Sequence, residues 1–176
     1  MEIENKKIIL FDMDMTLVDS SIAKQYCKNY KEVQKHISEF SLYEGIKESI
    51  DKLAEQHTIY IVSGNVGSTV KKVIQHFNLN ITLENVYGYR QGYPMENLAR
   101  KIKVMQVAID AILQSLQITK SDLLYIGDEV DDYKACQQNG INFLGCVWGN
   151  NELKQISNMN TISHPKDIVE AINAIG

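Results

Sequence analysis

The sequence predicts an α/β fold, in which helices cover both faces of a parallel β-sheet. Short apolar runs rich in β-branched residues alternate along the chain with longer segments of helical period, which is the pattern of such a sheet. No internal repeat, low-complexity tract or Pro/Gly-rich linker interrupts the alternation. With 176 residues, the chain is long enough for one sizeable core and too short for two ordinary domains. We therefore expect a single domain over residues 1–176.

Five strands are expected, and helices with an apolar face lie between them. Apolar residues recur at three- and four-residue steps over residues 66–77 and 102–116, which indicates two helices facing the core. The segment from Ser20 to Glu44 fits this pattern least, and we expect it to form one helix, Ile22 to Phe40, over a sheet edge or a pocket. The expected strands are Lys7 to Phe11, Thr58 to Val62, Leu83 to Tyr87, Leu123 to Ile126 and Asn142 to Val147.

Charge and cysteine content exclude several classes of function. The chain has 18 basic and 22 acidic residues, interspersed, with a net charge of -4, so it has no electrostatic footprint for nucleic acid or an anionic membrane. Cys27, Cys136 and Cys146 are odd in number and widely spaced, which disfavours a disulfide framework or a structural zinc site. The N-terminus resembles neither a signal peptide nor a membrane span. We expect a cytoplasmic protein with a small soluble partner.

Polar side chains follow three of the expected strands directly. In an open parallel sheet, ligands bind outside the carboxyl ends of the strands, so we expect these side chains to converge on one face. In chain order they are Asp12 and Asp14, then Ser63, Gly64 and Asn65, and then Asp128 with Asp131 and Asp132 beyond it.

The acidic residues among them predict a site for a hard cation. Asp12 and Asp14 would repel each other unless a cation or a proton lies between them, and Asp128 from a neighbouring strand adds a third carboxylate. The motifs at these strand ends contain no His or Cys to favour a softer metal, and Mg²⁺ prefers carboxylate oxygens together with water and phosphate. The alternative is that Asp12 and Asp14 form a turn and cap the next helix.

These residues resemble the ordered motifs of the haloacid dehalogenase-like phosphohydrolases, in the branch similar to phosphoglycolate phosphatases. Asp12-Met13-Asp14-Met15-Thr16 looks like the first motif, Ser63 like the second, and the stretch from Gly127 to Asp132 like the fourth. The third motif is a lysine, and Lys103 precedes Asp128 by the 25 positions (128 − 103) usual in this branch. The similarity covers roughly residues 7 to 150, and four ordered motifs are far more specific than any single one.

The resemblance implies a Rossmann-like fold and a hydrolytic mechanism with two acidic residues. Asp12 would attack phosphorus and form an aspartyl-phosphate. Asp14 would protonate the leaving alcohol and then deprotonate the water that clears the intermediate. The resemblance also implies that Mg²⁺ is held by Asp12, Asp128 and the main-chain carbonyl of Asp14. Asp132 would be a further ligand or would orient the waters of the metal.

The resemblance further implies a set of groups that bind the phosphoryl oxygens. Ser63 and Lys103 would bind these oxygens directly, and amides around Gly64 and Asn65 would add donors at the start of the following helix. Two assignments stay open. Lys101 is the rival of Lys103, because family members usually place a proline after this lysine whereas Val104 follows Lys103.

The second open assignment concerns the last acidic role, for which Asp131 and Asp132 compete. The usual interval favours Asp132, and the other residue is expected to cap the helix that follows. Met15 stands where many family members have glycine, so the backbone there must be tolerated without one.

The part of the chain that sets specificity is expected to be small. Only 47 positions separate Thr16 and Ser63 (63 − 16), so a full helical cap does not fit, and residues 20–44 are a reduced cap. The expected substrate is a phosphorylated small molecule. A bulky phosphate in an open site, a neighbouring subunit of a homo-oligomer as lid, and a broad metabolite range all remain open. The alternative function is a non-catalytic phosphate-binding or regulatory protein on the same fold.

Overall fold

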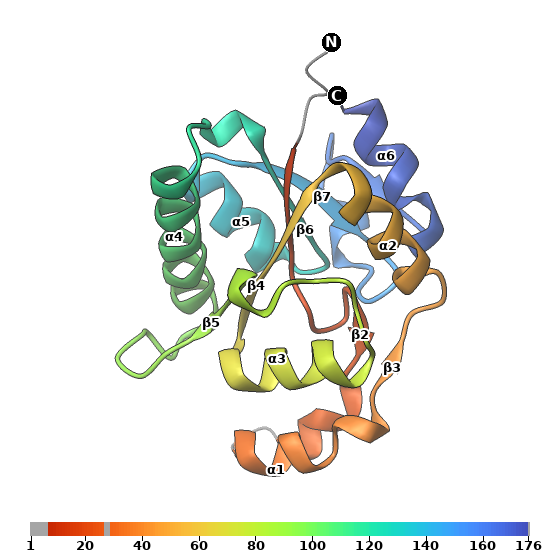
Figure 1. Cartoon of the computed structure of the whole chain (residues 1–176), viewed down its shortest axis with the longest axis vertical. Helices are drawn as coiled ribbons and strands as arrows, with labels where there is room; N and C mark the ends of the chain where they lie inside the picture. The colour runs from red at the N-terminus through yellow and green to blue at the C-terminus, as the bar shows by residue number, and fades with distance from the viewer. Residues whose placement is uncertain (1–6, 27–28, 176) are drawn as a thin grey trace.

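The structure, a computed structural model, describes residues 7–26 and 29–175. Within these residues, a parallel sheet of six strands forms the centre of the molecule, in the order β5-β4-β1-β6-β7-β8 (Figure 1). This confirms the predicted α/β fold. The strands are β1 (Ile8–Phe11), β4 (Thr58–Val66), β5 (Val86–Tyr89), β6 (Leu123–Gly127), β7 (Asn142–Cys146) and β8 (Thr161–Ile162).

Helices cover both faces of the sheet, and the alternation of side chains along β1 separates the two layers. Ile8 and Leu10 pack under α4 (Asn97–Ser115) and α5 (Val130–Asn139). Ile9 and Phe11 face the opposite layer, which contains α2 (Ile46–Gln56), α3 (Gly67–His76) and α6 (Ile168–Ala174). Because successive side chains of a strand point to opposite faces, a strand covered on both sides must be apolar throughout. The central position of β1 therefore explains its uninterrupted apolar run.

Two strands differ from their predicted bounds by more than one residue, and β8 was not among the five predicted strands. β4 continues to Val66 instead of ending at Val62, and its pairing with β5 shifts register between those two residues. Ser63, Gly64 and Asn65 thus lie within an irregular strand end. β5 begins at Val86 because residues 83–85 form a short 3₁₀ helix instead. The polar sequence Glu84-Asn85 interrupts the apolar alternation there, and the Asn85 side chain donates to the carbonyl of Ile59 at 3.0 Å.

The expectation of one helix from Ile22 to Phe40 is wrong. The segment forms three short helices instead, a 3₁₀ helix at Ser21–Tyr26, α1 at Tyr30–Lys35 and a 3₁₀ helix at Ile37–Glu39. Asn29 explains the break, because its side chain accepts hydrogen bonds from the amides of Lys31 and Glu32 and so starts a new helix. Cys27 lies outside the described residues, while Cys136 and Cys146 are free and buried.

A two-stranded antiparallel ribbon joins this cap segment to the body of the protein. It consists of β2 (Val18–Asp19) and β3 (Ser41–Leu42). α1 lies at one end of the molecule, below α3 in the view of Figure 1, on the side where the sheet strands end. None of the helices in the described part of the chain combines the length and the hydropathy required to cross a bilayer.

The turn between β1 and β2 is held in a conformation that few side chains tolerate. Met15 has a φ of 58°, in the left-handed region where glycine is favoured, as expected for a position that many relatives give to glycine. The Trp148 indole donates to the carbonyl of Thr16 at 2.9 Å. A Cβ on Gly149 would lie 1.9 Å from the carbonyl oxygen of Met15. The hydrogen bond from Trp148 and the close packing of Gly149 therefore hold this turn in place.

Candidate active site

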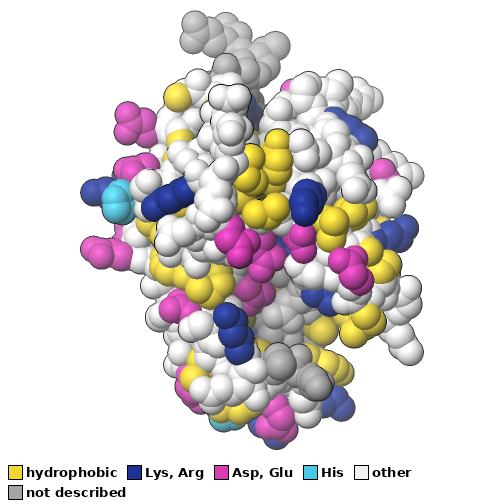
Figure 2. All heavy atoms as spheres, turned by 180° about the vertical axis from the view of Figure 1, so that it is seen from behind, with side chains coloured by type: hydrophobic (Ala, Val, Ile, Leu, Met, Phe, Trp, Pro, Cys, Tyr) yellow, Lys and Arg dark blue, Asp and Glu magenta, His cyan; other side chains and the backbone are white. Residues whose placement is uncertain are grey.

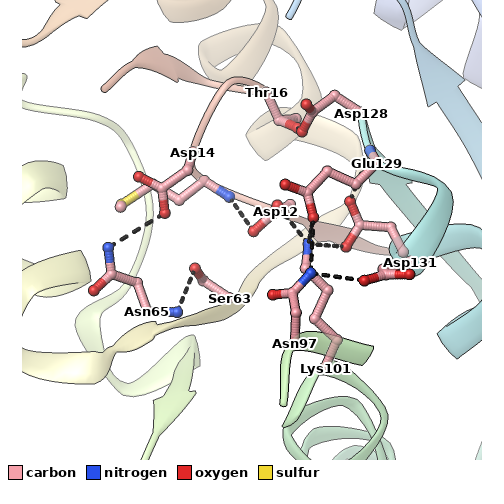
Figure 3. Close-up of polar contacts among 12 residues, drawn as sticks. Asp12, Asp14, Thr16, Ser63, Asn65, Asn97, Lys101, Asp128, Glu129 and Asp131 are labelled. Atoms are coloured by element: carbon pink, nitrogen blue, oxygen red, sulfur yellow. Dashed lines mark hydrogen bonds and ion pairs between the residues drawn. The ribbon is translucent and has the colours of Figure 1, made fainter. Parts of the chain in front are cut away.

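Most of the residues singled out from the sequence meet at the carboxyl ends of the central strands (Figure 3), but Lys103 does not. Asp12 directly follows β1, Asp128 directly follows β6, and Ser63 lies near the end of β4. All three are buried. Asp14 lies two residues beyond Asp12 and is partly buried. Parallel neighbours that end at one level bring these side chains together.

Three buried carboxylates form an oxygen-rich cluster. One oxygen from each of Asp12, Asp128 and Asp132 lies within 4.8 Å of the others. Burial raises the pKa of Asp128 to about 8, and the neighbouring charges of Asp12 and Asp132 add to the effect. Burial likewise raises the pKa of Asp132 to about 7, against the opposing charge of Lys101. Thr16 donates to Asp128 at 3.0 Å. A hard divalent cation fits this donor set, because its charge would offset the repulsion that raises these pKa values.

Lys101 supplies positive charge beside this cluster. Its Nζ lies 2.5 Å from Asp132, 3.1 Å from Glu129 and 3.3 Å from Asp12. Burial acts to lower the pKa of Lys101, but the three carboxylates outweigh it and raise the pKa well above its usual value. Lys101 is therefore charged across the neutral range. In a buried site, close ion pairs with good geometry are needed to repay the cost of removing such a charge from water.

The structure reverses the preference for Lys103 over Lys101. Lys103 is exposed and is not among the residues that line the cavity at the site. Two residues along a helix correspond to a rotation of about 200°, so the two lysines point to opposite sides of α4. Lys101 extends the buried stripe of Val104, Met105 and Ala108 by one turn. The helical period of α4 was the sequence signal that favoured Lys101. The spacing of the family motif favoured Lys103 and was given more weight.

Asp132, rather than Asp131, points into the site. One Asp132 oxygen accepts from Lys101, and the other accepts from the amide of Glu129 at 3.2 Å. Asp132 thus also caps α5. That capping role was expected for whichever of Asp131 and Asp132 lay outside the site. Asp131 instead accepts from the Asn97 side chain at 2.8 Å. Because Asp132 is the third residue of α5, its side chain can reach back to the amide of Glu129.

Asp14 is oriented by one hydrogen bond from the cap and one from β4. Its two oxygens accept from the Ser20 hydroxyl at 2.6 Å and from the Asn65 side chain at 3.3 Å. Burial raises the pKa of Asp14, although both hydrogen bonds oppose this effect. Ser63 accepts from the amide of Asn65 at 3.1 Å. Ser63 does not cap the helix that follows it, because α3 has Val66 at its N-cap position.

Sequence reasoning missed three further residues near the cluster. Glu129 pairs with Lys101, and Asn97 donates to both Glu129 and Asp131. Arg100 donates to the side-chain oxygen of Asn97 at 3.0 Å. Asn97 lies four positions before Lys101, on the same face of α4, and this spacing was the signal that could have revealed it.

A cavity of about 470 Å³ opens in front of these groups. Asp12, Ser63 and Lys101 form part of its wall. The cap segment lines another part, and the connection from β5 to α4 lines a third. From behind, Asp and Glu side chains gather near the middle of the molecular face, above the lobe formed by the cap (Figure 2). The carboxylates thus face a space large enough for a small organic ligand.

The fold and the site together define a class of α/β protein with an acidic centre at the carboxyl edge of its parallel sheet. Residues 21–146 match the family described as haloacid dehalogenase-like hydrolase. The chain belongs to this family and is a hydrolase, which confirms the resemblance stated above. The matched range includes Ser63, Lys101 and Asp128 and begins after Asp12 and Asp14. None of the curated protein sequences matches the chain.

Solved structures show the same fold over nearly the whole chain. A phosphatase candidate from Clostridium difficile is 18% identical with a TM-score of 0.76, over 94% of this chain and 98% of its own. A haloacid dehalogenase-like hydrolase from Streptococcus pneumoniae is 19% identical with a TM-score of 0.69, over 96% and 99%. A phosphoglycolate phosphatase candidate from Lactobacillus plantarum is 15% identical with a TM-score of 0.68, over 94% and 99%.

Replacing Lys101 with methionine should destabilise the protein much more than the same change at Lys103. Lys101→Met leaves buried carboxylates without their ammonium partner, which costs about 3 to 5 kcal/mol in comparable cases. The loss should be larger at pH 8 than at pH 5, because the carboxylates can take up protons at the lower pH. Lys103→Met should change the free energy of unfolding by less than about 0.5 kcal/mol. Urea unfolding at both pH values measures this, and equal losses for the two variants would contradict the assigned ion pairs.

Proposed function

We propose that the protein is a Mg²⁺-dependent phosphatase that hydrolyses phosphate monoesters of small molecules through an aspartyl-phosphate on Asp12. The observation that carries the proposal is the position of Asp12. Its carboxylate belongs to the acidic cluster, contacts Lys101 and lines the cavity. An anionic nucleophile can approach an anionic phosphate only where positive charge lies beside both groups. Lys101 and a bound metal would supply that charge.

The donor set supports Mg²⁺ as the metal. Asp12 and Asp128, with the main-chain carbonyl of Asp14, would hold it. A bound Mg²⁺ would offset the repulsion between the anionic nucleophile and the anionic ester. Asp132 already accepts from Lys101 and from the amide of Glu129. These contacts support the positioning role for Asp132 over direct ligation.

Asp12 and Asp14, the two acidic residues of the first motif, would have different roles in the reaction. An Asp12 oxygen attacks phosphorus, the bond from phosphorus to the ester oxygen breaks, and Asp14 gives its proton to that oxygen. Asp14 then accepts a proton from water, which attacks phosphorus and frees Asp12 and inorganic phosphate. The raised pKa of Asp14 supports this role, since burial favours the protonated acid that the first step needs. Its contacts with Ser20 and Asn65 would hold the carboxyl in one orientation.

Ser63 and Lys101 would hold the phosphoryl oxygens during both steps. Ser63 is buried at the cavity wall, and its hydroxyl has a proton to donate, because its oxygen accepts from the amide of Asn65. Lys101 carries a permanent charge beside Asp12. Preorganised donors of this kind stabilise the charge that develops on phosphoryl oxygens. The backbone of Gly64, which also lines the cavity, would approach the same oxygens.

Asp12→Asn should abolish turnover of every phosphate ester, because an amide cannot act as the nucleophile. We expect a loss on the order of 10³-fold or more in kcat for an aryl phosphate. Asp110→Asn is the matched control, since Asp110 is exposed on α4, and it should retain activity. Turnover that survives in Asp12→Asn at the wild-type rate would reject the mechanism and favour a non-catalytic role for the chain.

Asp14→Asn should affect esters according to their leaving groups. A poor leaving group such as an alkoxide needs the proton of Asp14, so its hydrolysis should slow by roughly 10² to 10⁴-fold. An activated ester such as dinitrophenyl phosphate departs without protonation, and its first step should change little. Single-turnover rates for both esters separate the two cases. Equal losses would reject Asp14 as the general acid.

Mg²⁺ should stabilise the protein more at high pH than at low pH. The folded pKa values of Asp128 and Asp132, about 8 and about 7, lie above the unfolded value of about 3.9. Their contribution to stability is therefore complete below pH 4 and lost as the pH rises through 7 and 8. Mg²⁺ binds the deprotonated form, and 100-fold excess over its Kd adds about 2.7 kcal/mol.

Thermal unfolding with and without Mg²⁺ at pH 5.5 and 8.5 measures this effect. We expect a rise in Tm that is larger at pH 8.5 and is lost in Asp128→Asn. Titration with Na⁺ at equal ionic strength controls for screening. A shift of the same size at both pH values, or one that survives in Asp128→Asn, would contradict the assignment of the metal to this cluster.

A further inference from the structure

Two large hydrophobic side chains are exposed on the wall of the active-site cavity. Among the described residues, the exposed large hydrophobics are Met95 (72% exposed), Tyr30 (46%) and Ile175 (37%). Met95 and Tyr30 both line the cavity. They come from different segments, Tyr30 from α1 of the cap and Met95 from the connection between β5 and α4. Exposed apolar surface that collects at a cavity marks a place where a ligand is bound.

Other apolar groups extend this wall. Val33 and Ala23 line the cavity from the cap, and Val66 and Tyr89 line it from β4 and β5. The Tyr89 hydroxyl lies 3.1 Å from the sulfur of Met95, so Met95 is held against the cavity side of its loop. Methionine and tyrosine side chains adapt well to the shape of apolar ligands.

The proposed chemistry places the alcohol of the substrate on this side of the cavity. Asp14 must lie next to the ester oxygen to protonate it. The carboxylate of Asp14 accepts from Ser20, the residue that precedes the first helix of the cap. Ser20, Tyr30 and Met95 line one continuous cavity with Asp14. The leaving group therefore extends from Asp14 into the space between the cap and the connection from β5 to α4.

The charges of the cavity argue against a second anionic group on the substrate. Lys101 is engaged by three carboxylates. The guanidinium of Arg100 already donates to the carbonyl of Met95 and to Asn97, each at 3.0 Å. Lys24 is exposed on the cap, where water screens its charge. Glu129 also lines the cavity and would repel an anionic tail. Apolar contacts thus remain as the main source of affinity for the alcohol.

We propose that the substrate is a phosphate monoester whose alcohol carries an extended apolar group, held between Tyr30 of the cap and Met95. The proposal rests on the proposed role of Asp14, which sets the direction of the leaving group. It assigns Tyr30 and Met95 as specificity-determining residues. The phosphate end is then bound by the charged groups at the strand ends, and the apolar end by two side chains that have no part in the chemistry.

A homologous series of n-alkyl phosphates, from methyl to hexyl, tests the proposal with the full chain and Mg²⁺. Burial of one methylene is worth about 0.8 kcal/mol, or about fourfold in affinity. We expect kcat/KM to rise two- to fourfold for each added carbon until the cavity is filled. Esters of equal length with a terminal carboxylate are the matched comparison and should react more slowly than the alkyl esters.

Two variants and a control locate the effect. Tyr30→Ser and Met95→Ser should each flatten the dependence of kcat/KM on chain length, and Ile175→Ser should leave it as in the wild type. A flat series in the wild type, or a preference for the carboxylate esters, would overturn the apolar group while leaving the phosphatase mechanism intact. No turnover of any ester, methyl phosphate included, would instead contradict the proposed function itself.

Discussion

The ammonium of Lys101 is the counter-charge on which this acidic site depends. Burial raises the pKa of Asp12, and the charge of Lys101 opposes that rise. Without a cation nearby, carboxylates buried this deeply would hold protons, and a protonated Asp12 could not act as the nucleophile that we propose. Lys101 is fixed by its place on α4, whose buried stripe packs on the sheet and on α5. The packing of one helix thus controls the ionisation of these carboxylates.

The sheet itself sets the spacing of the acidic residues. The amide of Asp12 donates to the carbonyl of Ile126 at 2.9 Å, so the ladder between β1 and β6 extends to Asp12. Asp128 follows Ile126 by two residues on the neighbouring strand. Because backbone hydrogen bonds hold neighbouring strands about 4.8 Å apart, the two carboxylates meet without any help from a loop. This rigid backbone is what a preorganised site requires.

The fold could be predicted from the sequence because its signals are local. Apolar runs and helical period locate the strands and helices. The residues that follow β1 and β6 and those at the end of β4 lie together, as the topology of a parallel sheet demands. Lys103 was preferred to Lys101 because the motif spacing was given more weight than the helical period of α4. The start of a new helix after Asn29 was missed because a capping signal involves only a few residues, whereas the helical period extends over the whole segment. Glu129 and Asn97 meet across two helices, and no local pattern encodes such a pair.

Trp148 and Gly149 bear on the order in which the site can form. Both hold the turn that carries Asp14, although they lie more than 130 positions away from it in the chain. During synthesis the first motif leaves the ribosome well before Trp148 and Gly149, which hold its turn. Such distant contacts carry a high entropic cost of loop closure and form late in folding. A nascent chain therefore contains Asp14 long before the turn that carries it is held in place.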